Sequence, residues 1–129
     1  MTTQKFDIHK AALVAAENLA ARVERIYDYQ VLCITGSQVL AKTQAQAADV
    51  ESAIAAEVAF NPEFKNDTQR KAAVVQLKAN NPDLQNIKDA IAEQETQNAL
   101  NRLEVEALKQ AQQADRAIID LSVALLGSI

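Results

Sequence analysis

Apolar residues at helical spacing dominate the beginning of the chain. Six of them follow one another in steps of three and four residues, or close to it: Ile8, Ala12, Ala15, Leu19, Val23 and Ile26. This spacing places them on one face of an amphipathic helix. The sequence therefore predicts a helix over residues 7–35, with Asp7 as its N-cap and the β-prone run 31–35 as its buried last turn before Gly36.

Three further helices are predicted from the residues that interrupt the apolar pattern. Ser37 can cap a helix over 37–60, which Pro62 stops because the residue before a proline avoids the α region. Asn66 or Asp67 can cap a short helix over 67–80, and Asn80-Asn81 marks its end. Pro82 suits the first position of a last helix over 82–126, which contains no glycine or proline before Gly127.

The last helix carries the most regular apolar pattern. Its apolar residues follow heptad-like steps typical of a coiled-coil or bundle seam, and we predict that they form an oligomer seam: Leu100, Leu103, Ala107, Ala114, Ile118, Leu121 and Leu125. Polar residues interrupt the pattern between Ile91 and Leu100. We expect a polar layer, a kink or an exposed stretch at that place.

Composition favours an all-α fold. The 129 residues include 25 alanines but only two glycines, two prolines and no tryptophan, too few turn residues for many short strands. The pattern indicates one helical domain over residues 1–129, an antiparallel helical hairpin or bundle, coiled-coil-like, in which helix 37–60 packs against the long C-terminal helix. That last helix would be roughly 68 Å long, more than helix 37–60 can cover, so we expect an extended molecule that self-associates.

Residues able to perform chemistry are few. The single Cys33 excludes an intrachain disulfide and lies among apolar neighbours, so we interpret it as a buried, unreactive side chain. His9 is the only histidine and is expected on the surface, and the isolated Gly36 cannot form a phosphate-binding loop. The sequence therefore predicts a protein that is not an enzyme, with no catalytic residue, no cofactor and no metal site.

Charge makes nucleic acid a poor main partner. The net charge is −4, which phosphate repels. One segment is locally basic and is a candidate nucleic-acid patch: Lys65, Arg70, Lys71 and Lys78. No run approaches the ~18 apolar residues of a membrane span, and the N-terminus has no signal-peptide pattern, so we expect a cytoplasmic protein without membrane contact.

The basic segment also carries a family resemblance. The residues Asn66, Arg70 and Ala72, after one long helix and before another, resemble a turn found in small helical proteins of phages and prophages. The resemblance extends over residues 40–121 and implies a helix, a short turn and a long return helix. It also implies structural roles: Asn66 caps the turn, and Arg70 ties it to a neighbouring carboxylate. Several such proteins are encoded near phage recombination or replication genes and have no established activity.

Two functional hypotheses follow. The first is a non-enzymatic helical assembly or adaptor protein of phage or prophage origin, which forms a homo-oligomer or binds another helical protein along residues 100–125. The second is an accessory factor for phage recombination or replication that binds single-stranded nucleic acid through the basic segment. An enzyme would need catalytic residues assembled at a subunit interface, and the sequence offers none.

Overall fold

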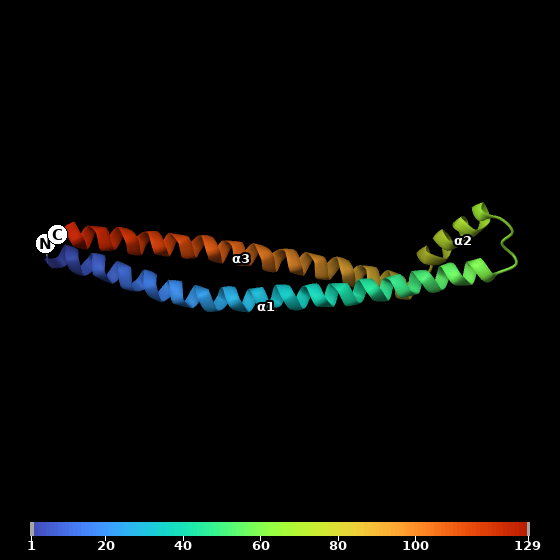
Figure 1. Cartoon of the computed structure of the whole chain (residues 1–129), viewed down its shortest axis with the longest axis horizontal. Coiled ribbons are helices and arrows are strands. Elements are labelled where there is room, and N and C mark those ends of the chain that lie inside the picture. Colours follow the sequence, from blue (N-terminus) through green and yellow to red (C-terminus); the bar gives the residue numbers. More distant parts are fainter. Residues whose placement is uncertain (1, 129) are drawn as a thin grey trace. The chain divides into compact units, whose positions relative to one another are not determined.

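The computed structural model describes residues 2–128, which form three helices and no strand (Figure 1). These are α1 (Thr2–Phe60), α2 (Asp67–Ala79) and α3 (Pro82–Ser128). The long helices α1 and α3 run antiparallel and pack against each other. Ile26 of α1 packs with Val105 and Leu108 of α3, whereas Ala47 of α1 packs near Leu84 of α3. The predicted all-α helical hairpin is confirmed.

Helix α1 is a single helix, and the predicted break at Gly36 is wrong. Residues 31–35 are helical, as expected, but all except Cys33 are exposed instead of forming a buried last turn. The helix continues through Gly36, so that Asp7 and Ser37 lie inside it and cap nothing. Glycine inside a helix costs only about 1 kcal/mol relative to alanine, which packing can offset. Gly36 is buried, and a Cβ there would lie 3.0 Å from Cγ of Asn98 and 3.1 Å from Nε2 of Gln94. Glycine therefore allows α3 side chains to lie against the α1 backbone.

Helix α1 begins at Thr2, five residues before the predicted start at Asp7, whereas the predicted ends at 60, 67, 80, 82 and 126 agree with the structure to within two residues. Asn66 caps α2, since its Oδ1 accepts a hydrogen bond from the Gln69 N–H at 2.9 Å. Asn81 caps α3 in the same manner, accepting from the Leu84 N–H at 2.9 Å, and Pro82 is the first helical residue. The sequence therefore sets these boundaries through local side-chain chemistry.

Contacts divide the chain into two units. Unit 1 consists of residues 1–34 and 99–129, and unit 2 consists of residues 35–98. In unit 1 the apolar core contains Ile26, Val105 and Leu108, with Tyr29 and Cys33 packed against it. In unit 2 the core is built around Leu84, which is fully buried with Ala47 and Ile54. The N-terminal part of α1 therefore pairs with the C-terminal part of α3 of the same chain.

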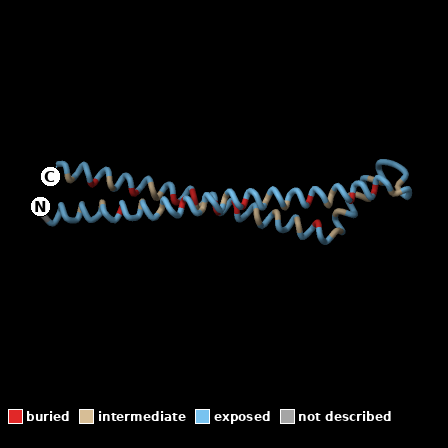
Figure 2. Tube along the Cα trace, turned by 60° about the horizontal axis from the view of Figure 1, so that its bottom comes forward, coloured by how far each residue is buried: buried red, intermediate tan, exposed pale blue. Residues whose placement is uncertain are grey.

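Burial on both long helices repeats every seven residues. Most of the buried and half-buried positions (Figure 2) form what we call the inner seam, and the positions of the inner seam alternate in steps of three and four. On α1 these positions are Ile8, Ala12, Ala15, Leu19, Arg22, Ile26, Tyr29, Cys33, Gly36, Leu40, Thr43, Ala47, Val50 and Ile54. On α3 they are Leu84, Ile87, Ile91, Gln94, Asn98, Asn101, Val105, Leu108, Gln112, Asp115, Ile119, Ser122 and Leu126.

Polar side chains occupy part of the inner seam. Asn98 is only 2% exposed and accepts a hydrogen bond from Nε2 of Gln94 at 2.8 Å. This is the polar layer expected between Ile91 and Leu100. In unit 1 the buried carboxylate of Asp115 forms an ion pair with Arg22, whose guanidinium also donates to the carbonyl oxygen of Ala111 at 3.3 Å. The inner seam therefore combines apolar packing with specific polar pairs.

Candidate interaction site

The predicted oligomer seam lies outside the contact between α1 and α3. We call its residues the α3 stripe: Leu100, Leu103, Ala107, Ala114, Ile118, Leu121 and Leu125. All seven are exposed, and the exposed fractions of Leu100, Leu103 and Leu121 are 53%, 65% and 61%. The α3 stripe is thus an apolar surface that α1 leaves uncovered.

Helix geometry explains why the α3 stripe stays exposed. Leu100, Ala114 and Leu121 each directly precede a residue of the inner seam, namely Asn101, Asp115 and Ser122. Consecutive helical residues are rotated by about 100° around the helix axis. Residues that directly precede the inner seam therefore lie on a different face of α3. Packing of α1 on the inner seam therefore leaves the α3 stripe free along its length.

Few charged side chains of α3 border the α3 stripe. Glu104 lies between stripe positions, and its Oε1 pairs with Nη2 of Arg25 on α1 at 3.4 Å. Glu106 lies one turn after Leu103, and the other exposed charges of this part of α3 lie on another face of the helix: Arg102, Lys109, Arg116 and Asp120. Segregation of this kind is typical of a helix with two apolar contact faces and one solvated face.

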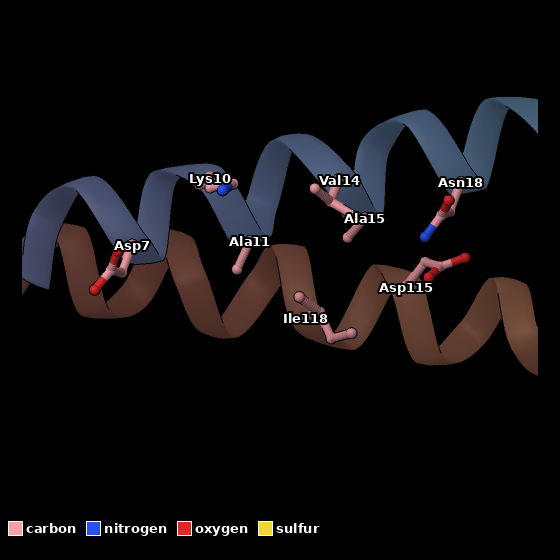
Figure 3. A pocket seen from close by; sticks show the side chains of 8 residues that line it. All are labelled: Asp7, Lys10, Ala11, Val14, Ala15, Asn18, Asp115 and Ile118. Carbon is pink, nitrogen blue, oxygen red and sulfur yellow. The ribbon is translucent and has the colours of Figure 1, made fainter.

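A groove in unit 1 adjoins the α3 stripe. It has a volume of about 400 Å³, and its apolar lining comes from Ala11, Val14 and Ala15 of α1 and Ile118 of α3 (Figure 3). Asp7, Lys10, Asn18 and Asp115 provide its polar lining, and the Asn18 side chain points toward Asp115. The groove shows that Ile118 and the Ala11–Val14 side of α1 face the same way.

Two of the four cations in the basic segment of unit 2 form ion pairs within the chain. Nη1 of Arg70 pairs with Oδ1 of Asp67 at 3.1 Å, and Nζ of Lys78 pairs with Oε2 of Glu51 at 3.4 Å. Asn66 thus caps α2, and Arg70 pairs with a carboxylate of the same helix. Lys65 is exposed in the turn, and Lys71 lines an apolar groove of about 440 Å³ between α1 and α2 together with Arg70. Two of the four candidate cations thus already contact a carboxylate.

The residues considered for chemistry lie apart from one another. Cys33 is half-buried against the unit 1 core, and His9 is exposed on α1. Within residues 2–128, no three histidine, cysteine or acidic side chains are close enough together to hold a metal ion. None of the described helices combines the length and the apolar character required to cross a lipid bilayer.

A second exposed apolar surface, on α1, was not predicted from the sequence. It contains an apolar residue every seven positions, and we call it the α1 stripe: Phe6, Leu13, Ala20, Tyr27 and Ile34. The signal that could have revealed it is this strict interval of seven. Sequence reasoning instead selected the one face of the helix that includes Ile8, Leu19 and Ile26.

Comparison with known proteins gives no relative. No protein-family model, curated protein or solved structure matches this chain. Any function must therefore be argued from the surfaces described above.

Proposed function

We propose that this protein is a non-enzymatic helical assembly or adaptor protein that self-associates through the α3 stripe. The observation that carries the proposal is the separation of two apolar faces on α3. One face packs on α1, and the other remains exposed from Leu100 to Leu125. Helices of other copies would pack on this second face in a coiled-coil or bundle contact.

The exposed area supports association. The chain exposes 9158 Å². A folded monomer of 14.0 kDa typically exposes about 6,700 Å², so this chain leaves about 2,500 Å² more surface in water. Stable protein interfaces take about 800 Å² from each partner. The excess is therefore large enough to supply an interface.

The origin and the setting are also proposals. The turn built by Asn66 and Arg70 resembles that of small helical proteins of phages and prophages, and it supports a phage or prophage origin. We also propose a cytoplasmic location.

Single-stranded nucleic acid is the weaker proposal for the partner. It would bind Lys65, Arg70, Lys71 and Lys78, of which Arg70 and Lys78 already pair with carboxylates. Binding of an oligonucleotide that weakens steeply as salt increases, and that is lost when these four residues become alanine, would support this alternative.

Sedimentation velocity of the double variant Leu103→Lys/Leu121→Lys tests the proposed function. Both side chains lie in the α3 stripe and outside the inner seam, so lysine there keeps the hairpin but places charge in the proposed interface. We expect the wild-type chain to sediment as an oligomer and the variant to have a lower mass.

The matched control is Ala92→Lys/Gln113→Lys, which adds the same charge at exposed positions of α3 outside the stripe. It should keep the mass of the wild type. A wild-type monomer at micromolar concentration, or an unchanged mass for Leu103→Lys/Leu121→Lys, would contradict the proposal.

A further inference from the structure

We infer that the α1 stripe is a second self-association surface, occupied by another copy of this chain, so that the assembly contains more than two chains. This inference rests on the proposed function, because it treats the α3 stripe as the first interface. It adds a second interface on the other long helix and specifies its residues.

The α1 stripe is at least as exposed as the α3 stripe. The exposed fractions are 67% for Phe6, 52% for Leu13, 66% for Tyr27 and 62% for Ile34, and Ala20 between them is also exposed. Residues seven apart drift by only about 20° around a helix, so these side chains lie nearly in line. Large apolar side chains at such exposure contribute little to the fold of a single chain, because most of their surface remains in water.

Uncharged residues continue this surface between the members of the stripe. Ala16, Val23 and Gln30 each lie three residues after a stripe position and are exposed. Together with the stripe they form steps of three and four, the spacing of a second helix-packing seam. Helix α1 therefore has one seam for α3 and another for a partner that is absent from the single chain.

The two stripes face opposite sides of unit 1. Leu13, Ala20 and Tyr27 each directly follow a residue of the inner seam, whereas every residue of the α3 stripe except Leu103 directly precedes one. Helices α1 and α3 run antiparallel. A residue that follows the inner seam on α1 and a residue that precedes the inner seam on α3 therefore point to opposite sides of the helix pair. The groove in Figure 3 agrees, since Ile118 lines it with Ala11 and Val14, which precede the inner seam on α1, and none of the α1 stripe lines it.

The exposed area identifies a further copy as the occupant. A single interface through the α3 stripe would remove about 800 Å² from each chain, or about a third of the 2,500 Å² excess. A second interface of similar size on the opposite side would remove a comparable share. A single contact between two chains cannot cover the stripes on both sides of each hairpin. An assembly in which every stripe is covered therefore requires more than two copies.

The masses of four variants test the inference by sedimentation velocity. We expect the wild-type chain to exceed the mass of two chains. Tyr27→Lys/Ile34→Lys should reduce it to two chains, Leu103→Lys/Leu121→Lys should also give two chains, and the combined variant should give one. Ala45→Lys/Ser52→Lys adds the same charge at exposed α1 positions beyond the stripe and should keep the wild-type mass.

The outcomes separate the two proposals. If Leu103→Lys/Leu121→Lys lowers the mass but Tyr27→Lys/Ile34→Lys does not, the second interface is refuted and the proposed function stands. If only the α1 variant lowers the mass, the assignment of the α3 stripe fails instead. A wild-type chain that never exceeds two copies also overturns the inference.

Tyrosine fluorescence gives a test without charge insertion. The chain has two tyrosines and no tryptophan, so Tyr29→Phe leaves Tyr27 of the α1 stripe as the single fluorophore and keeps a ring in the core. Quenching of Tyr27 by acrylamide should fall as the concentration increases through assembly. Quenching that stays constant while the mass increases would refute occupation of the α1 stripe.

Discussion

Gly36 and Asn98 lie together in unit 2 in a contact that depends on the size of both side chains. A Cβ at Gly36 would overlap Oδ1 of Asn98, which is buried and held by Gln94. We expect Gly36→Ala to destabilise the protein by about 1 to 3 kcal/mol, the usual effect of overpacking, even though alanine favours the helix. The free energy of unfolding in urea, measured at one chain concentration, checks this.

The effect of Gly36→Ala on stability should change sign when Asn98 is also replaced, and this change makes the test specific for the contact. In an Asn98→Ala background the overlap is removed, and Gly36→Ala should then stabilise the protein by up to about 1 kcal/mol through helix propensity. An equal destabilisation in both backgrounds would mean that the Gly36–Asn98 contact does not determine the residue at position 36.

Two ion pairs of unit 1 differ in burial and should differ in strength. The Asp115 carboxylate is buried and pairs with the half-buried Arg22, whereas Arg25 and Glu104 have side chains 58% and 39% exposed. Arg22→Ala leaves a buried carboxylate unpaired and should destabilise the protein by about 3 kcal/mol. Arg25→Ala should cost less than about 1 kcal/mol. Thermal unfolding of both variants gives the comparison, and equal losses would contradict it.

The two helix caps belong to helices that contribute differently to the buried core. Asn81 caps α3 at the turn that holds the fully buried Leu84, whereas Asn66 caps α2, which has no buried residue among its described positions. Asn81→Ala should therefore lower the free energy of global unfolding by about 1 kcal/mol. Asn66→Ala should accelerate hydrogen exchange within α2 and leave global unfolding unchanged. A global loss of equal size in both variants would show that α2 is integral to the core.

Helix ends could be predicted from sequence where local chemistry decides them. Asn66, Asn81 and Pro82 act within one turn of their own position, so their roles follow from neighbouring residues. Gly36 could not be assigned in this way. Its role depends on Asn98, far along the chain, whose side chain occupies the space that a Cβ would fill.

The contact face of α3 was also beyond sequence reasoning. Residues 100–125 contain a more apolar face than the one that packs on α1, where Asn101, Asp115 and Ser122 are buried. Hydrophobic pattern alone therefore selects the α3 stripe. The polar inner seam becomes understandable only with Arg22, which lies in the otherwise apolar pattern of α1 and pairs with Asp115. The reason to expect self-association also changes. The sequence argument was that helix 37–60 is too short to cover the last helix, whereas in the structure α1 covers one face of α3 and a different face remains exposed.

Linkage between folding and association gives the final prediction for the whole protein. If copies bury each other's stripes only when folded, association stabilises the folded state by mass action, and the Tm must rise with chain concentration. The rise should vanish in the combined variant Tyr27→Lys/Ile34→Lys/Leu103→Lys/Leu121→Lys, which retains the inner seam of each hairpin. Thermal unfolding followed by circular dichroism over a hundredfold concentration range measures this. A wild-type Tm that stays constant over that range would mean that the stripes are exposed in the folded protein in solution, and both association surfaces would then be rejected together.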